Sequence, residues 1–134
     1  MLAIPLDKLA YIIEKAREFD AESAPVNENT HGDGDDEEIA EILDETRGNP
    51  TYQEFVGAIN SLNDDERDEI VALAWLGRGD FSKHEWRGAK AAAHERHNGR
   101  EAAYLAGTPL LADYLEEAVS QLGYSLEEFE IGRL

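Results

Sequence analysis

Apolar residues recur every three or four positions along most of the chain, which is the spacing of one face of an α-helix. This spacing predicts a first helix from about Pro5 to Phe19 and a short second helix from about Glu37 to Thr46. Residues 20–36 separate the two helices and contain almost nothing apolar except Val26. Because such a segment cannot bury enough surface to order itself strongly, we expect an acidic, flexible linker there.

The same spacing predicts a third helix that carries Tyr52 to Leu62 and a fourth helix that starts after Asn63. Asn63 and Glu66 have the spacing of a capping box, a reciprocal pair of side-chain to backbone hydrogen bonds at a helix start. Gly77 is expected to end the fourth helix, because glycine readily adopts the left-handed conformation that follows a last helical turn.

Ser82 begins another capping pattern and predicts a fifth helix that runs through an alanine-rich stretch to about His97. Thr108 is expected to cap a final helix, with Pro109 at its first position and Gly123 after its end. This last helix has the strongest amphipathic pattern in the chain.

No stretch of the sequence keeps the alternating apolar and polar pattern of a half-buried strand. We therefore expect an all-α fold, a compact bundle of five to seven short helices with the acidic linker near residues 20–36. At 134 residues the chain is predicted to form a single domain. Within it, residues 1–47 would supply N-terminal helices and the linker, and residues 48–134 the helical core.

The composition of the chain argues against several classes of function. Thirty acidic residues against 12 Lys and Arg give a net charge of −18, which disfavours direct nucleic-acid binding because phosphates would be repelled. The absence of cysteine excludes disulfides and thiolate chemistry. No apolar run approaches a membrane span, and the first residues lack a signal-type pattern, so we expect a cytoplasmic protein.

The negative charge is not uniform along the chain. Residues 1–67 carry 18 acidic and 5 basic residues, whereas residues 68–134 carry 12 and 7. On the predicted fifth helix, five residues spaced by 4, 3, 4 and 3 form one basic stripe: Lys83, Arg87, Lys90, His94 and His97. Together with Arg78 and Asp80 just before that helix, they are the candidate interaction or anion-binding residues.

Three interpretations of the basic stripe remain open. It could pack near acidic segments of its own chain, meet an acidic surface on another protein or a second copy, or hold a small anion. The division of charge between the two halves makes a charge-complementary contact, within the chain or between copies, a specific expectation.

Metal and catalytic patterns are weak. Residues 27–38 place oxygen-bearing residues at several positions of a calcium-loop spacing, but the fifth position is His31, a poor ligand for a hard cation. His94 and His97 are three residues apart, not four as in the zinc-protease pattern, and no third ligand is evident. We therefore predict no catalytic residues, no metal site and no cofactor.

Two strings of the sequence resemble a known family. Ile70–Asp80 (IVALAWLGRGD) and Gly107–Glu117 (GTPLLADYLEE) are similar to the bacterial family described as domain of unknown function 3775. The resemblance covers about residues 51–129. It implies a small bacterial, cytosolic protein and brings no known activity, partner or catalytic residue.

Three functional hypotheses follow. The first is a noncatalytic interaction or regulatory module, binding an unknown protein partner or a second copy. The second is an acidic decoy that imitates nucleic-acid charge. The third is an enzyme or small-anion site around Arg78 to His94.

Overall fold

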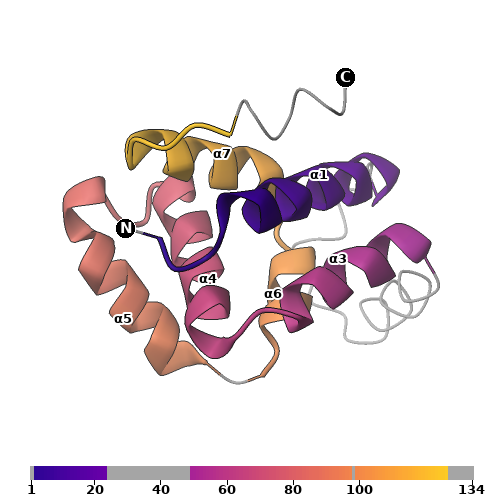
Figure 1. Ribbon diagram of the computed structural model, residues 1–134, viewed down its shortest axis with the longest axis horizontal. Coiled ribbons are helices and arrows are strands. Elements are labelled where there is room, and N and C mark those ends of the chain that lie inside the picture. The colour runs from indigo at the N-terminus through magenta and orange to yellow at the C-terminus, as the bar shows by residue number, and fades with distance from the viewer. Residues whose placement is uncertain (1, 24–48, 98, 127–134) are drawn as a thin grey trace, which may run out of the picture.

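The computed structural model describes residues 2–23, 49–97 and 99–126, and in these residues it is an all-α fold (Figure 1). The described part contains six α-helices and one short 3-10 turn: α1 (Leu6–Ser23), α3 (Pro50–Asn60), α4 (Asp64–Arg78), η2 (Lys83–Glu85), α5 (Trp86–Arg96), α6 (Glu101–Ala106) and α7 (Leu111–Gln121). The predicted helix at 37–46 and the calcium-like spacing at 27–38 lie outside the described residues.

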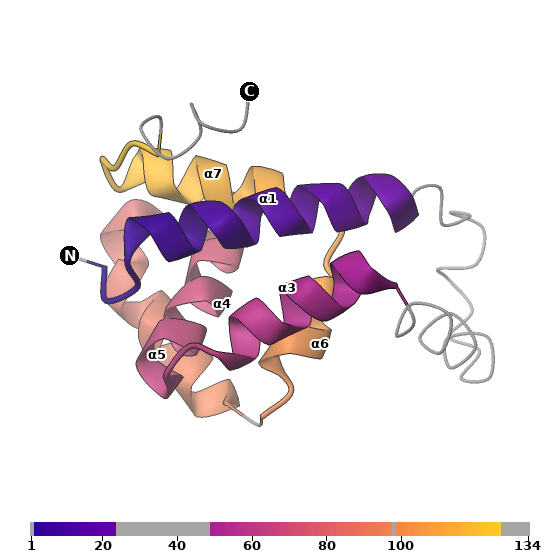
Figure 2. The ribbon, with the colours of Figure 1, turned by 45° about the vertical axis from the view of Figure 1, so that its right-hand side comes forward.

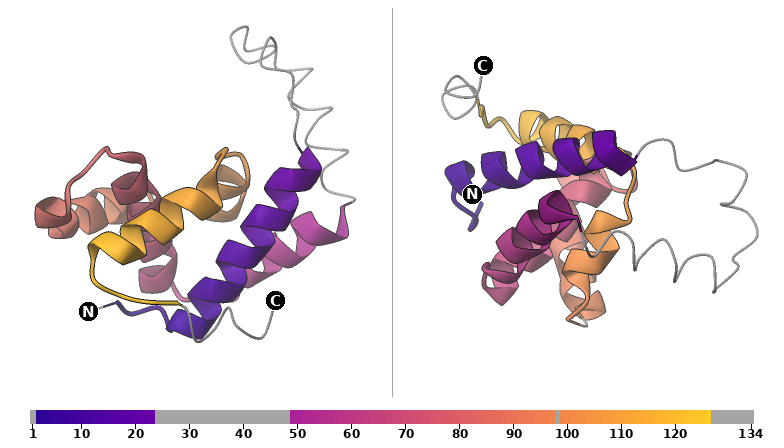
Figure 3. Two further views of the ribbon diagram at one scale, coloured as in Figure 1. Left: turned by 90° about the horizontal axis from the view of Figure 1, so that it is seen from above. Right: turned by 90° about the vertical axis from the view of Figure 1, so that its right-hand side faces the viewer.

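Helix α4 is the centre of the arrangement. It packs against α7 on one side and α5 on another, while α1 packs against α3 and α7 (Figures 1 and 2). Viewed from above, α5 and α3 lie on opposite flanks of the molecule (Figure 3). The core is built from aliphatic side chains and one phenylalanine, among them Leu9, Ile13, Phe55, Ile70, Leu73 and Leu115. None of the described helices is both long and apolar enough to cross a membrane.

Several helix ends are stabilised as the sequence predicts. Asn63 accepts from the backbone N–H of Glu66 at 2.9 Å, and Glu66 Oε1 accepts from the N–H of Asn63 at 3.0 Å, which confirms the capping box of α4. The Ser82 N–H donates to Glu85 Oε1 at 2.8 Å at the start of η2. Gly123 follows the end of α7 with φ 89°, a conformation in which glycine avoids the strain of a side chain.

The first helix is longer than expected. Helix α1 continues through Ser23, so the prediction of a linker from residue 20 is wrong for residues 20–23. No proline or glycine interrupts the chain between Pro5 and Pro25. The ring of Phe19 also packs on Tyr52 of α3, with ring centroids 5.4 Å apart, which ties the last turns of α1 to its neighbour.

The predicted end of α4 is also wrong. The helix passes through Gly77 and ends at Arg78. Gly79 caps it with φ 98°, and the Gly79 N–H donates to the carbonyls of Trp75 and Leu76. Gly77 is needed for a different reason. A Cβ at this position would lie 1.8 Å from the carbonyl oxygen of Tyr114, so only glycine lets α4 and α7 approach this closely.

Thr108 does not begin the final helix. Its hydroxyl donates to the carbonyl of Tyr104 at 2.9 Å, so it caps the C-terminal end of α6. Helix α7 starts three residues later, at Leu111, after Leu110 has turned the chain with φ 62°. The expectation that Thr108 and Pro109 start this helix is therefore wrong, because the hydroxyl satisfies the preceding helix instead.

Candidate functional site

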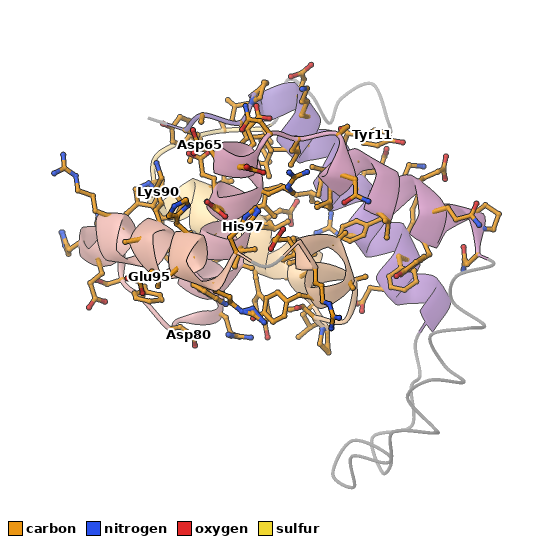
Figure 4. All side chains as sticks on the ribbon, turned by 90° about the horizontal axis from the view of Figure 1, so that it is seen from below. Tyr11, Asp65, Asp80, Lys90, Glu95 and His97 are labelled. Atoms are coloured by element: carbon orange, nitrogen blue, oxygen red, sulfur yellow. The ribbon has the colours of Figure 1, made fainter. Side chains whose placement is uncertain are left out.

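The basic stripe begins at Lys83 in η2, continues along α5 and ends at His97, the cap of α5, and its later part lies against carboxylates on α4. Ala89 and Ala93, both buried, are the α5 residues of the core, and their small side chains allow α5 to lie close to α4. This closeness brings the last three stripe residues within reach of acidic residues on α4 (Figure 4). The stripe thus takes part in a charge-complementary contact inside the chain.

Asp68 joins the two histidines of the stripe. Its Oδ2 lies 2.8 Å from His94 Nδ1, and its Oδ1 lies 3.0 Å from His97 Nδ1. The Asp68 side chain is only 6% exposed, whereas that of His94 is 74% exposed. A single buried carboxylate therefore holds the C-terminal half of α5 on α4 through two hydrogen bonds.

His97 lies near three carboxylates. Besides Asp68, its Nε2 lies 3.6 Å from Asp64 Oδ1 and its Nδ1 lies 3.9 Å from Glu101 Oε1. The hydrogen bond to Asp68, helped by the charges of Glu101 and Asp64, raises the pKa of His97 above its usual value.

Glu69 is a buried carboxylate beside the stripe that the sequence pattern does not single out. Its side chain is fully buried, and its two oxygens accept the backbone N–H groups of Ala3 and Ile4, both at 2.9 Å. Lys90 Nζ of the stripe lies 3.5 Å from Glu69 Oε2 and supplies a balancing charge. A signal was present, because Glu69 stands four and seven residues before Leu73 and Leu76 and so lies on the buried face of α4.

These contacts also hold the N-terminal segment. The N–H of Leu2 donates to the Tyr124 hydroxyl at 3.0 Å, next to the bonds from Ala3 and Ile4 to Glu69. Three successive backbone N–H groups thus donate hydrogen bonds to side chains, one of which belongs to α4 and the other to the segment after α7. The stripe residue Lys90 is therefore part of the attachment of the N-terminal segment.

The other end of the stripe is different. Lys83 and Arg87 are exposed, and within the described part of the chain neither has an ion-pair partner. Arg78 lies before the stripe and pairs with Asp80, whose Oδ2 accepts from Arg78 Nε at 3.0 Å. This hydrogen bond is the main reason why the pKa of Arg78 is raised. The structure thus brings together Lys90, His94 and His97 with α4, and leaves Lys83 and Arg87 facing solvent.

The described residues contain a small pocket but no cluster of metal ligands. Among residues 2–23, 49–97 and 99–126, no group of three or more His, Asp or Glu side chains is arranged to hold a metal ion. A small pocket between α1, α3 and the connection from α6 to α7 is lined by apolar side chains such as Phe19, Phe55 and Leu111. Its free space is about that of one water molecule.

Comparisons with known proteins place the chain in a family. The model of the family described as "Protein of unknown function (DUF3775)" matches residues 52–124, more than half of the chain. This range includes α4, α5 and all the stripe residues, while α1 precedes it. No curated protein and no solved structure matches the sequence. The chain therefore belongs to the DUF3775 family, in agreement with the resemblance of its two strings.

Proposed function

We propose that this protein is a noncatalytic interaction module that binds an acidic protein surface through the exposed start of the basic stripe. The proposal rests on one observation: part of the stripe contacts α4 and the other part is exposed. Lys90, His94 and His97 contact carboxylates on α4, whereas Lys83 and Arg87 remain exposed. The packing of α5 on α4 accounts for the first group and leaves the second available.

The charge of the whole chain defines the kind of partner. At −18 the molecule repels extended polyanions at long range, so a general attraction to negative charge is excluded. A partner that presents a few carboxylates at a defined place can still pair with Lys83 and Arg87 at short range, where local complementarity sets orientation and specificity. Trp86 stands between them in the sequence and is half-buried, with its ring centroid 5.9 Å from Lys90 Nζ.

The proposal is tested by reversing one charge at a time. Arg87→Glu changes an exposed cation of the stripe, and Lys8→Glu is the matched control on α1, with the same charge change at an exposed position. Tagged wild type and both variants are used to capture proteins from an extract of the native host, and quantitative mass spectrometry compares the captured proteins. Sedimentation velocity on the purified proteins measures self-association in parallel.

A protein, or a second copy, that binds wild type and Lys8→Glu but is lost with Arg87→Glu supports the proposal. Equal binding by all three proteins, or binding that is lost equally with Lys8→Glu, contradicts it. Circular dichroism should show the same helix content in all three, because neither substitution removes a buried contact.

A further inference from the structure

A second surface lies on the other flank of α5 and combines aromatic rings with arginines. It consists of Trp75, Arg78, Phe81, Arg96 and Tyr104, which we call the aromatic–arginine cluster. These residues come from α4, from the connection to η2, from α5 and from α6. In Figure 4, Asp80 next to this cluster lies on the opposite side of α5 from Lys90.

The rings of the cluster are fixed by specific contacts. Trp75 Nε1 donates to the Tyr104 hydroxyl at 2.9 Å, and the rings of Trp75 and Phe81 stack with centroids 6.0 Å apart. All three aromatic side chains are only half-buried, so part of each ring remains available to a partner. Fixed, partly exposed aromatic rings lose little conformational freedom on binding.

The two arginines are held differently. Arg78 donates to Asp80 at 3.0 Å, so its charge is largely used within the chain. Arg96 instead lies over the face of Tyr104, with its guanidinium carbon 3.9 Å from the ring centroid. Within the described residues no carboxylate pairs with Arg96. The guanidinium is thus held against the ring while Arg96 stays exposed, so its N–H groups are available for two parallel hydrogen bonds to a carboxylate.

We propose that the aromatic–arginine cluster is the specificity surface of the module, on which an acidic segment of the partner protein places a carboxylate against Arg96. The inference rests on the proposed function, because it names a second contact for the same acidic partner. Trp, Tyr and Arg are the residue types that dominate binding energy at protein interfaces, and four chain segments bring them together here. The guanidinium of Arg96 would bind a carboxylate of the partner, and the half-buried rings would contact apolar atoms of the partner next to that carboxylate.

Two tryptophans make the two surfaces separately observable. The indole N–H of Trp75 belongs to the cluster, whereas Trp86 lies beside Lys83 and Arg87 in the sequence. A short synthetic peptide with two glutamates beside apolar residues serves as the acidic probe. It is added to the ¹⁵N-labelled full chain at about 150 mM salt, which screens the repulsion by the net charge of −18. We expect the Trp75 indole signal to shift on titration with a saturable dependence on peptide concentration.

Arg96→Lys keeps the charge and removes the planar fork, so it should weaken the affinity measured at Trp75 by about tenfold, the effect of losing one charge-assisted hydrogen bond. Glu95→Gln, at an exposed neighbouring position of α5, is the matched control and should bind at least as well as wild type. Tyr104→Phe should move the Trp75 signal already in the free protein, because it removes the hydroxyl that accepts the indole N–H.

The results separate the two proposals. A Trp75 shift that Arg96→Lys weakens and Arg87→Glu leaves unchanged supports the cluster and contradicts the proposed use of Arg87. A Trp86 shift with an unmoved Trp75 signal contradicts the cluster alone. An affinity that is unchanged in Arg96→Lys overturns the role of the guanidinium, and no response at either indole overturns both.

Discussion

Glu69 shows how one residue can hold distant parts of this chain together. Its buried carboxylate receives two backbone N–H groups from residues 3 and 4 and lies beside the ammonium of Lys90. An unpaired charge at this depth would be strongly destabilising, so the three partners together are what allow a carboxylate there. The N-terminal segment therefore depends on a residue more than sixty positions away.

Glu69→Gln should lower the free energy of unfolding by roughly 3 kcal/mol, because the amide can accept only one of the two N–H groups and no longer balances Lys90. Urea unfolding followed by circular dichroism measures the change. Glu95→Gln, on the exposed side of α5, is the control and should change stability by less than about 0.5 kcal/mol. A Glu69→Gln protein as stable as this control would show that the carboxylate does not hold the N-terminal segment.

His97 makes part of the stability depend on pH. Its pKa is raised in the folded protein, chiefly by the hydrogen bond to Asp68, so the folded state holds the proton more tightly than the unfolded chain does. This contribution is fully present below the unfolded histidine pKa of about 6.5 and is lost as the pH rises through the higher folded value.

Wild type should therefore lose stability relative to His97→Gln as the pH is raised from about 6 to 8.5. Denaturant unfolding at a series of pH values measures this difference, and an NMR titration of the His97 ring measures its pKa directly. A difference that is constant with pH, together with an ordinary His97 pKa, would contradict the contact with Asp68.

The residues of the candidate site were predictable only in part. The spacing of charged residues predicts one helical stripe of Lys83, Arg87, Lys90, His94 and His97. In the structure Lys83 lies in η2 and His97 caps the end of α5, and the last three stripe residues contact α4. The partners Asp68 and Glu69 could not be identified in the same way. Which acidic residue of one helix meets which base of another depends on how the two helices pack, and periodicity within a helix does not contain that information.

At the scale of the elements, the contact between α4 and α7 depends on a glycine inside a helix. Glycine normally weakens a helix interior, but a Cβ at Gly77 would lie 1.8 Å from the Tyr114 carbonyl oxygen. The sequence shows Gly77 and Gly79 on either side of Arg78, near a helix end. Only the tertiary approach of α7 determines that Gly79 ends the helix and Gly77 serves packing, which is why the predicted boundary was two residues short.

Gly77→Ala should destabilise the protein by about 3 kcal/mol or more, because the clash is with backbone that cannot rotate away. Gly88→Ala is the matched substitution inside α5, where an added Cβ meets nothing within 4 Å, and it should instead stabilise by about 0.5–1 kcal/mol through helix propensity. Thermal unfolding compares the two variants. Similar melting temperatures for both would mean that α7 does not approach α4 so closely.

The turn between α6 and α7 contains a strained residue. Leu110 has φ 62° and ψ 21°, a left-handed conformation that disfavours residues with a Cβ, and its side chain is half exposed. Leu110→Asn should raise stability by up to about 1 kcal/mol, because asparagine tolerates this conformation better and little apolar burial is lost. Leu110→Val should lower it, since a β-branched residue fits there least. Calorimetric melting temperatures in the opposite order would contradict the assigned backbone conformation.

At the scale of the whole molecule, the all-α fold follows from the apolar periodicity and the capping residues. The start of α4 was predicted to the residue because its cap is local, a pair of side chains three positions apart. The end of α1 and the start of α7 were missed because contacts with other elements decide them. Phe19 packs on Tyr52 of α3, and Thr108 bonds to the preceding helix.

The folded chain distributes its charged residues unevenly, although the net charge is −18. The basic stripe has an internal part, where Lys90, His94 and His97 contact carboxylates of α4, and an exposed end formed by Lys83 and Arg87. The proposed interaction surface is therefore a consequence of how α5 packs, and the division of the stripe is the claim on which it depends.

The rate at which individual lysines react with acetic anhydride, read by mass spectrometry of the folded protein, tests that division most directly. Lys83 should react as fast as Lys8, an exposed lysine of α1, while Lys90 should react more slowly because its ammonium is paired with buried Glu69. Glu69→Gln should remove the difference. Equal rates for Lys83 and Lys90 in the wild-type protein would contradict the division of the stripe.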